Sequence, residues 1–354
     1  MASRTSAWVL REQGRINSLE LIQDHALREL GEHDVLVKLY AASLNYREIV
    51  IAKGEPALPF FRPGVVPGSD GAGVVEAVGS NVRAFKVGDR VCTHLTSQMP
   101  AADPPTMHEV CRGLGQKVDG TLRSHGVFHD TELVAMPAGL TFLEASTLTC
   151  SGLTAWNALF GVRGYVPGSG DVVLVQGTGG VSIAALQFAL AAGSTVIATT
   201  SSDAKMEKLK ALGAQHVINY RADPKWGETA KSLSSDGKGV NVVVDVGGLS
   251  TLSQSFNAVR IDGMVAVTGL LGGSNGQDAV PTMMDCLYKV CTARGIVLGT
   301  RDQFREMNAF VEEKGIRPVV DEKVFGFHEA REAYEYLQQQ HHFSKVCIQL
   351  QGAE

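Results

Sequence analysis

The sequence predicts an α/β protein with two parts, a doubly wound parallel sheet and a second domain built from short β-strands. Three observations support this prediction. The chain has 354 residues, which is about two domains at roughly 150 residues each. Residues 171–300 alternate apolar runs with helical segments, whereas the first 140 residues contain short strands joined by Gly- and Pro-rich turns. Glycine is the compositional outlier at 39 residues, which is typical of a chain with many tight turns.

Six apolar runs separated by helical segments predict the parallel sheet. Helical spacing is clearest after the first run, where Ile183, Leu186 and Leu190 recur at intervals of three and four. Strands that are apolar throughout are typical of a parallel sheet covered on both faces, and six strand–helix units match a doubly wound arrangement. The expected strands are 172–176, 195–200, 216–220, 240–247, 264–269 and 295–300.

The remaining chain predicts one discontinuous β-rich domain. The short strands of the first 140 residues favour a twisted, barrel-like unit. A helix at 329–340 and a strand at 345–350 have no core of their own, so we expect them to pack on that unit. The predicted domains are therefore 1–150 with 297–354, and 151–296. The polar, Pro-containing segment 95–118 is long for a loop, which is compatible with a lid or an insertion.

Composition and charge argue against two classes of partner. Lys and Arg total 32 against 37 Asp and Glu, and they form no basic cluster, so we expect no nucleic-acid partner. The longest apolar stretches are far shorter than the roughly 18 residues of a membrane-spanning helix, so we expect no membrane association. The first 15 residues lack the apolar segment of a secretory signal, and the six Cys form no CxxC pair. We therefore expect reduced thiols and a cytoplasmic location.

A glycine-rich turn is the strongest functional motif. Gly177, Thr178, Gly179, Gly180 and Val181 stand directly between the first apolar run and a helix. In that context the glycines let the backbone approach a pyrophosphate, whose charge lies at the helix N-terminus. A tight turn in another kind of α/β sheet is the alternative. The strand before, the helix after and a second strand about 20 residues further on favour a dinucleotide site.

The end of the second expected strand indicates NADPH as the cofactor. NAD sites usually place Asp or Glu there to bind the ribose 2′-hydroxyl. This strand instead ends at Thr200, followed by Ser201, Ser202 and, one turn into the next helix, Lys205. Hydroxyls and an ammonium could bind a 2′-phosphate, and Tyr220 could flank the adenine. Taken singly, Lys205 could be a solvated helix residue and the serines an N-cap, so the missing acid is the more informative fact.

Across its whole length the sequence resembles the medium-chain dehydrogenase/reductases. The resemblance implies a GroES-like catalytic domain made from both chain ends, with a Rossmann cofactor domain inserted between them. It also implies a homodimer, in agreement with the apolar sixth strand, 295–300, which would form an unprotected sheet edge. The matching segments are 35–49, 67–91, 148–159, 173–189, 196–214 and 341–348.

Within that family, the resemblance places this chain in a branch without zinc. Zinc-dependent members carry Cys, His and Cys where this chain has Asn45, Ser69 and Cys150. Two of the three ligands are thus replaced by groups that bind zinc poorly, so we expect no metal. A rebuilt site of Asp70, His94 and Cys150 is the alternative; otherwise Cys150 is a small buried hydrophobe.

The zinc-free branches that the chain resembles include quinone reductases and enoyl reductases, and SLNYREIV (43–50) is close to a segment of the latter. The resemblance places Asn45 beside the nicotinamide and the substrate oxygen, where its amide could donate to an oxyanion. An Asx turn is the alternative for Asn45. Tyr46 is either a proton donor or a core aromatic. We expect an NADPH-dependent reductase of activated C=C bonds or quinones; a ketoreductase or alcohol dehydrogenase, or a non-catalytic cofactor-binding protein, remains open.

Several further residues are expected around the reacting groups. Thr154 would contact the carboxamide, and Gly269, Leu270 and Leu271 would line the nicotinamide. His94, which follows a strand of the first domain, could be an acid facing the site or a structural residue. Apolar residues that could form the pocket wall, although each could equally be core, are Phe60, Phe61, Met99 and Met283.

Overall fold

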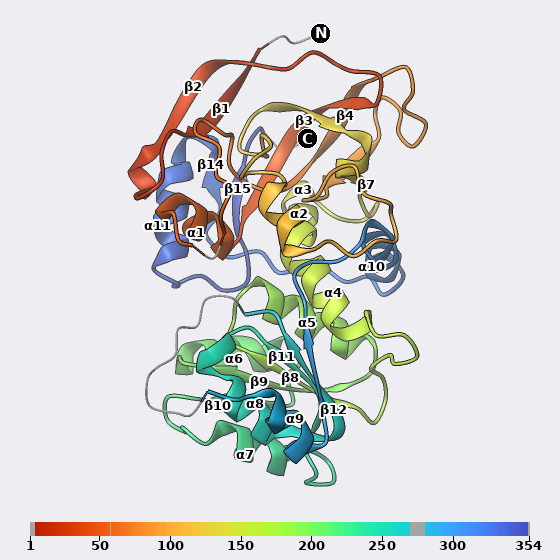
Figure 1. The fold of residues 1–354 in the computed structure, drawn as a ribbon, viewed down its shortest axis with the longest axis vertical. Helices are drawn as coiled ribbons and strands as arrows, with labels where there is room; N and C mark the ends of the chain where they lie inside the picture. Colours follow the sequence, from red (N-terminus) through yellow and green to blue (C-terminus); the bar gives the residue numbers. More distant parts are fainter. Residues whose placement is uncertain (1–3, 57, 270–279, 353–354) are drawn as a thin grey trace. The chain divides into compact units, whose positions relative to one another are not determined.

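The computed structural model describes residues 4–56, 58–269 and 280–352 (Figure 1). Its internal contacts divide the chain into two compact units. The first unit comprises Met1–Leu153 and Leu298–Glu354, and the second comprises Thr154–Val297. Within the described ranges, no helix has both the length and the apolar character needed to cross a membrane.

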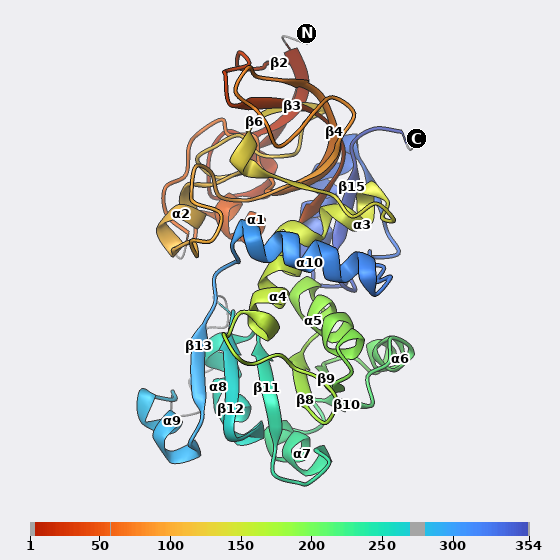
Figure 2. The same ribbon diagram turned by 90° about the vertical axis from the view of Figure 1, so that its right-hand side faces the viewer.

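The second unit is a six-stranded parallel sheet, which confirms the predicted fold class. The strand order is β10-β9-β8-β11-β12-β13, so the chain starts in the middle, runs to one edge and returns to fill the other (Figure 2). All of these neighbours pair in parallel. The strands are β8 (Val172–Gln176), β9 (Thr195–Thr200), β10 (His216–Asn219), β11 (Val240–Asp245), β12 (Val259–Val267) and β13 (Thr292–Gly295).

Several helices of this unit bury apolar side chains, whereas α9 has no buried residue. In α5, Ile183 and Leu186 are fully buried, as the helical spacing predicts, whereas Leu190 is only half-buried. In α7, Trp226 and Ala230 join the core formed by the sheet. The helices are α4 (Leu153–Phe160), α5 (Gly180–Ala191), α6 (Asp203–Ala211), α7 (Trp226–Leu233), α8 (Leu252–Ala258) and α9 (Met283–Lys289).

The sixth strand begins earlier than predicted, and this corrects the sequence analysis. β13 spans Thr292–Gly295, and residues 296–300 have no strand structure. The end of β13 is set by its partner strand, because β12 ends at Val267, which pairs with Gly295. Beyond that pair the Ile296 N–H donates to the Val267 carbonyl. The apolar run at 296–298 has strand propensity but no strand left to pair with.

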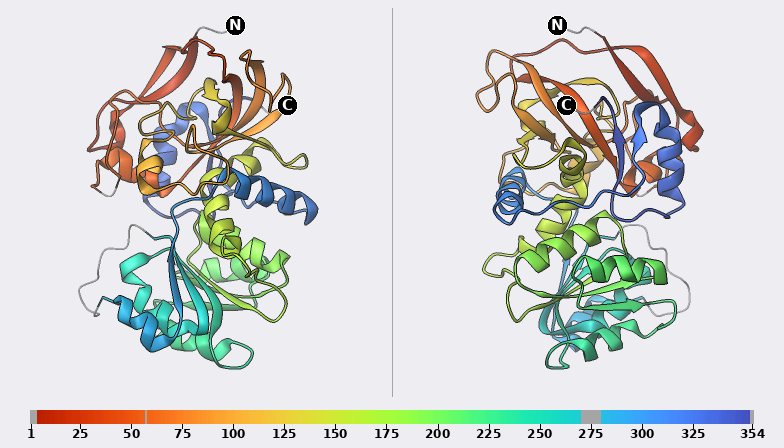
Figure 3. Two further views of the ribbon diagram at one scale, coloured as in Figure 1. Left: turned by 45° about the vertical axis from the view of Figure 1, so that its right-hand side comes forward. Right: turned by 180° about the vertical axis from the view of Figure 1, so that it is seen from behind.

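The first unit has a seven-stranded sheet in which β3 is the longest strand. One edge of β3 (Asp34–Leu44) pairs with β4 (Asp70–Val78), and the other is shared by two shorter strands. β6 (His125–His129) takes residues 34–38, and β15 (Val346–Gln349) takes residues 41–44. The C-terminal strand is therefore built into the N-terminal sheet, and Figure 3 shows this blue segment among red and orange strands.

The remaining strands and helices complete this unit. α11 packs against α1, so the C-terminal segment covers part of the N-terminal core. The segment 95–118 is more ordered than a long loop, because it contains the short helix α2. The strands are β1 (Arg4–Leu10), β2 (Leu19–Ala26), β5 (Arg90–Thr93), β7 (Leu133–Ala135) and β14 (Phe325–Gly326). The helices are α1 (Tyr46–Lys53), α2 (Met107–Arg112), α3 (Phe142–Ser146), α10 (Arg301–Glu313) and α11 (Ala330–Gln338), with a π-helical turn at Leu148–Gly152.

Candidate functional site

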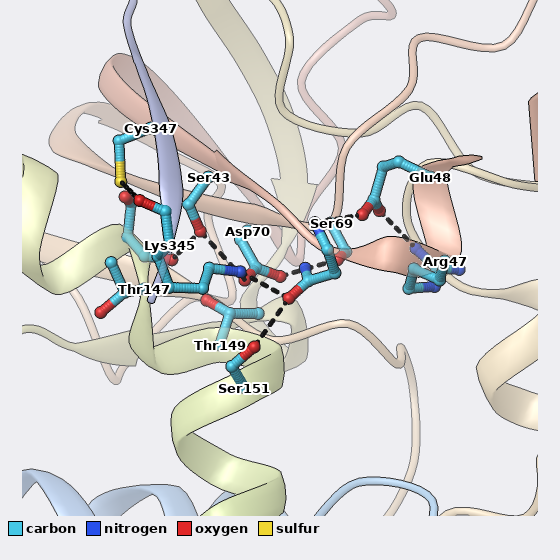
Figure 4. Close-up of polar contacts among 12 residues, drawn as sticks. Ser43, Arg47, Glu48, Ser69, Asp70, Thr147, Thr149, Ser151, Lys345 and Cys347 are labelled. Carbon is cyan, nitrogen blue, oxygen red and sulfur yellow. Dashed lines mark hydrogen bonds and ion pairs between the residues drawn. The ribbon is translucent and has the colours of Figure 1, made fainter. Parts of the chain in front are cut away.

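A cluster of buried polar side chains lies in the first unit where three strand ends meet (Figure 4). The Lys345 ammonium lies 2.5 Å from the Asn45 Oδ1 and 3.2 Å from the Asp70 Oδ2. The exposed fractions are 3% for Lys345, 8% for Asn45 and 0% for Asp70. A charge buried to this extent is tolerated only with partners, and Lys345 and Asp70 form that ion pair.

Sheet register brings these residues together. β15 runs antiparallel to β3, and Val346 pairs with Leu44, so the start of β15 meets the end of β3. On the other edge of β3, Asp70 pairs with Ser43, so β4 also begins at this point. Asn45 and Lys345 adjoin these pairs. They therefore lie close together although they are far apart in the sequence.

Asp70 is held in place by hydroxyl groups as well as by the ammonium. The Ser69 hydroxyl lies 2.7 Å from the Asp70 Oδ1, and the Ser43 hydroxyl lies 3.2 Å from the Oδ2. The main-chain carbonyl of Asp70 accepts from the Thr121 hydroxyl at 3.0 Å. With both carboxylate oxygens bonded, Asp70 is a fixed counter-ion for Lys345.

The Asn45 amide has a defined orientation. Its Oδ1 accepts from the Lys345 ammonium and, at 3.0 Å, from the Ser151 hydroxyl. Because an ammonium can only donate, the amide oxygen must face Lys345 and the NH₂ group must point away from it. The Nδ2 of Asn45 is buried and has no hydrogen-bond partner among the described residues. A buried donor without an acceptor is costly, and such a group is often kept for a ligand.

The backbone at Asn45 is fixed by the first turn of α1. The Asn45 N–H donates to the Glu48 Oε2 at 2.7 Å, and the Asn45 carbonyl accepts from the Glu48 N–H at 3.1 Å. Burial raises the pKa of the Glu48 carboxyl, whose other oxygen lies 3.2 Å from the Arg47 guanidinium. Arg47 also donates to the Leu114 carbonyl at 3.2 Å. Glu48 and Arg47 thus hold α1 in place.

Tyr46 and His94 have surroundings that favour structural roles. Tyr46 is partly buried and packs against the core of the first unit, and burial raises its pKa. In His94, Nδ1 lies 3.1 Å from the Thr96 carbonyl and Nε2 lies 3.3 Å from the Gly299 carbonyl. Burial lowers the pKa of His94 to about 4, so its ring is neutral near pH 7. The neutral ring can donate from Nε2 to the Gly299 carbonyl and accept at Nδ1 from the Thr96 hydroxyl, which lies 3.3 Å away. A buried ring that is neutral near pH 7 is poorly suited to be an acid.

The four predicted pocket-wall residues come from three segments, because Phe60 and Phe61 are adjacent in the chain. Phe60 is 44% exposed and contacts the His108 ring edge-on at 5.7 Å, while Phe61 packs against the core of the first unit. The carbonyl of Met99 accepts from Arg301 at 2.5 Å. Met283 lies on α9 of the second unit and is 79% exposed.

In the second unit, no other atoms of the described residues crowd the backbone of the glycine-rich turn at Gly177 and Gly179. Gly177 has a φ of 75°, and ideal Cβ atoms built on Gly177 and Gly179 would meet nothing within 4 Å. Gly179 caps α5, and the first turn of that helix carries no acidic residue. The helix dipole and the free N–H groups of the first turn therefore face space where a pyrophosphate could bind. Thr178, Gly180 and Val181 belong to the same turn and the start of α5.

The end of β9 has the hydroxyl groups that the sequence predicts, with one acid close by. The Thr200 hydroxyl accepts from the Ser202 N–H at 3.3 Å, and Ser201 and Lys205 are partly buried. Asp203, which the sequence analysis did not weigh, begins α6 and accepts from Asn219 at 2.6 Å. Tyr220 is 39% exposed, and its N–H donates to the Thr200 carbonyl at 3.0 Å.

Comparisons with known proteins identify the family. The alcohol dehydrogenase GroES-like domain matches residues 31–138, and the zinc-binding dehydrogenase domain matches residues 180–313. A zinc-type alcohol dehydrogenase-like protein of Schizosaccharomyces pombe is 43% identical over 91% of this chain and 92% of its own length. The chain belongs to the medium-chain dehydrogenase/reductase superfamily. A nicotinamide dinucleotide is accordingly its cofactor.

Other members carry different activities in their names. A quinone oxidoreductase of Lama guanicoe is 29% identical over 90% of this chain and 91% of its own length. A crystal structure of an NAD-dependent alcohol dehydrogenase has a TM-score of 0.85 at 32% identity, covering 98% of this chain and all of its own. A 2-octenoyl-CoA carboxylase reductase in complex with NADP and 2-octenoyl-CoA has a TM-score of 0.86 at 26% identity, covering 100% and 90%.

Although zinc appears in the names of the family domain and of the yeast relative, the residues here do not fit that metal. Asn45 offers an amide, Ser69 a hydroxyl and Cys150 a thiol whose pKa burial raises to about 12. The Asp70 carboxylate beside them is already paired with Lys345. An ammonium lies among them, and a dication would repel it. In the described part of the chain, no three His, Cys, Asp or Glu side chains are grouped to hold a metal.

The dinucleotide, by contrast, fits the second unit. The open turn at Gly177 and Gly179 leaves room for a pyrophosphate, and Gly269 has no space for a Cβ because Val246 and Gly248 are too close. Thr154 lies in the first turn of α4 and is buried. Leu270 and Leu271, predicted to line the nicotinamide, lie outside the described residues.

Sequence reasoning missed Lys345, Ser151 and a buried network beneath the cofactor turn. In that network, the Asp245 carboxylate accepts from Gln176 at 3.1 Å and from Ser255 at 2.6 Å. It joins the ends of β8 and β11. Lys345 could have been singled out, because it is a charged residue directly before the apolar run 346–348. The chain pattern does not show which residues it meets.

Proposed function

We propose that this protein is an NADPH-dependent, zinc-independent reductase of activated C=C bonds, in enones or enals, or of quinones. The observation that carries the proposal is the Asn45 amide, whose Nδ2 is buried without a partner while its oxygen is bonded to Lys345. This donor stands where zinc-dependent relatives place a metal ligand. In this proposal the Asn45 amide donates to the substrate oxygen, and the second unit binds the dinucleotide.

The available donor favours a conjugated acceptor over an isolated ketone. NADPH, when bound, supplies the hydride. Hydride addition to a saturated ketone concentrates charge on one alkoxide oxygen, which zinc stabilises in other members of the family. Addition to the β-carbon of an enone spreads the charge into an enolate. One amide N–H donor from Asn45 is a better match for that weaker, delocalised charge.

The proton that completes the reaction has two possible sources in this proposal. Tyr46 follows Asn45 directly, but burial raises the pKa of its phenol and it packs against the core. Water reaching the substrate carbon is the other source. Asn45 holds the enolate oxygen in either case, so the product assignment does not depend on the proton donor.

NADPH is proposed over NADH because of the end of β9. Thr200 stands where an NAD site carries an acid, and Ser201 and Lys205 can meet a 2′-phosphate. Asp203 is the nearest acid in sequence, and its Oδ1 is bonded to Asn219. The carboxylase reductase that is similar in structure was solved with NADP.

Alcohol dehydrogenase or ketoreductase activity is the second candidate, because several similar proteins are named alcohol dehydrogenases. An α,β-unsaturated ketone separates the two, since it offers both groups to one hydride. The purified protein is incubated with NADPH and this ketone after dialysis against a chelator, and the products are identified. The saturated ketone is the expected product. The allylic alcohol as the main product would favour the second candidate and overturn the first.

A further inference from the structure

We propose that Lys345 is a positioning residue, a fixed internal cation that orients and polarises the Asn45 amide in place of a metal. This inference rests on the proposed role of Asn45 as the donor to the developing oxyanion. It adds a residue from the C-terminal strand segment to a site otherwise formed by the N-terminal part of the first unit.

The burial and pairing of Lys345 are unusual for a purely structural lysine. Lysine is among the residues least often fully buried, yet Lys345 is 3% exposed. Its ammonium is bonded to Asn45 and Asp70, and Asp70 is fixed in turn by Ser43 and Ser69. Burying an ion pair contributes little to stability by itself, because desolvation offsets the attraction. Specificity of geometry is the better explanation for retaining it.

The geometry of the contact determines what Lys345 does to Asn45. The bond of 2.5 Å from ammonium to Oδ1 prevents the amide from flipping, since a flipped NH₂ group would face three N–H donors. It also draws electron density towards the oxygen, which makes the opposite Nδ2–H a stronger donor. Ser151 adds a second, neutral donor to the same oxygen. Lys345 therefore acts on the substrate through Asn45.

A double-mutant cycle tests this coupling. Lys345→Met removes the charge while keeping most of the volume, and Asn45→Ala removes the donor. Each single variant is expected to lower kcat by about one hundredfold, as loss of one oxyanion donor does. If Lys345 acts through Asn45, adding Lys345→Met to Asn45→Ala costs less than threefold more. The proposal would be overturned if the kcat losses of Lys345→Met and Asn45→Ala multiply in the double variant. It would also be overturned if Lys345→Met alone leaves kcat unchanged.

Two further variants deal with the buried carboxylate that Lys345→Met leaves unpaired. Lys345→Met combined with Asp70→Asn removes both charges, and the loss of kcat is expected to persist in it. Lys345→Arg keeps the charge and should retain more kcat than Lys345→Met. If Lys345→Arg and Lys345→Met lose kcat equally, Lys345 has a packing role instead. Lys86→Met, which removes an exposed lysine paired with Asp89, is the matched control and should leave kcat unchanged.

Binding measurements separate this inference from the proposed function. NADPH affinity, measured by fluorescence titration, is expected to change less than threefold in every Lys345 and Asn45 variant that melts cooperatively. The cycle is run with whichever acceptor the protein reduces best. If the protein reduces carbonyl groups but neither alkenes nor quinones, the proposed function is overturned. The double-mutant cycle, measured with the carbonyl substrate, would still decide the role of Lys345.

Discussion

The Nζ of Lys345 lies 2.5 Å from the Oδ1 of Asn45, although 300 residues separate the two in the chain. Both are buried, and the contact exists because β15 pairs with the end of β3. The polar groups at this point are amide, hydroxyl and ammonium groups, with the Asp70 carboxylate as the counter-ion of Lys345. The first unit therefore holds a buried ammonium that fixes the orientation of the Asn45 amide.

Asn45→Ala should lower kcat sharply. Loss of one oxyanion donor raises a barrier by about 3 kcal/mol, on the order of one hundredfold in rate. NADPH affinity should be nearly unchanged, because the cofactor is bound by the second unit. Steady-state kinetics and cofactor titration on one preparation measure both quantities. A variant with wild-type kcat would show that Asn45 only caps α1.

The purified protein should contain no stoichiometric zinc, because Asn45, Ser69 and the neutral thiol of Cys150 are poor ligands. Elemental analysis of protein purified without chelator measures the zinc content, and activity before and after chelation shows whether a metal matters. About one tightly held zinc per chain, with activity lost on chelation, would contradict this prediction.

Lys205→Ala should weaken NADPH binding by tenfold or more while changing NADH binding little. An ammonium–phosphate contact, which is a charge-assisted bond, forms only with the 2′-phosphate of NADPH. Titration with both cofactors measures the two affinities. As a comparison, Lys208→Ala alters an exposed lysine further along α6 and should affect neither. Equal losses of both cofactors in Lys205→Ala would assign Lys205 another role.

The stability of the protein should fall below pH 6.5 in a manner that depends on His94. Burial lowers the His94 pKa from 6.5 to about 4, so the unfolded chain binds its proton first as the pH falls. Stability attributable to His94 is complete above pH 6.5 and is lost between pH 6.5 and pH 4, by on the order of 3 kcal/mol. Urea unfolding of wild type and His94→Gln at several pH values measures the difference. Parallel pH profiles for the two proteins would refute the prediction.

The protein should form a homodimer through the β13 edge of the second unit. β13 pairs with β12 on one side, and α9 nearby exposes Met283, Leu287 and Tyr288 at 79%, 65% and 74%. Among the described residues no strand pairs with the other edge of β13, and such an edge beside exposed apolar residues favours pairing across a two-fold axis. Light scattering at micromolar concentration measures the mass. A dimer that Leu287→Arg with Tyr288→Arg dissociates is expected, whereas a wild-type monomer would contradict the prediction.

Short-range pattern was sufficient to predict the parallel sheet and the cofactor turn. Apolar runs at 172–176 and 195–200 specify buried strands, and the glycines at 177 and 179 need only their own turn and helix to form an anion site. These features depend on neighbours within a few residues, where propensity and periodicity act. The sixth strand was misplaced because its ends depend on where β12 stops.

The polar cluster around Lys345 could not be predicted in this way, because its residues are far apart in the sequence. The sequence by itself determined only the expectation, from the family resemblance, that Asn45 and Ser69 stand where other members carry metal ligands, and that Lys345 precedes a short strand. Only the tertiary structure decided that Lys345 faces the Asn45 amide and that Asp70 balances its charge. The physical reason is strand register: pairing Val346 with Leu44 and Asp70 with Ser43 brings the ends of three strands to one buried point, where an ammonium must find acceptors.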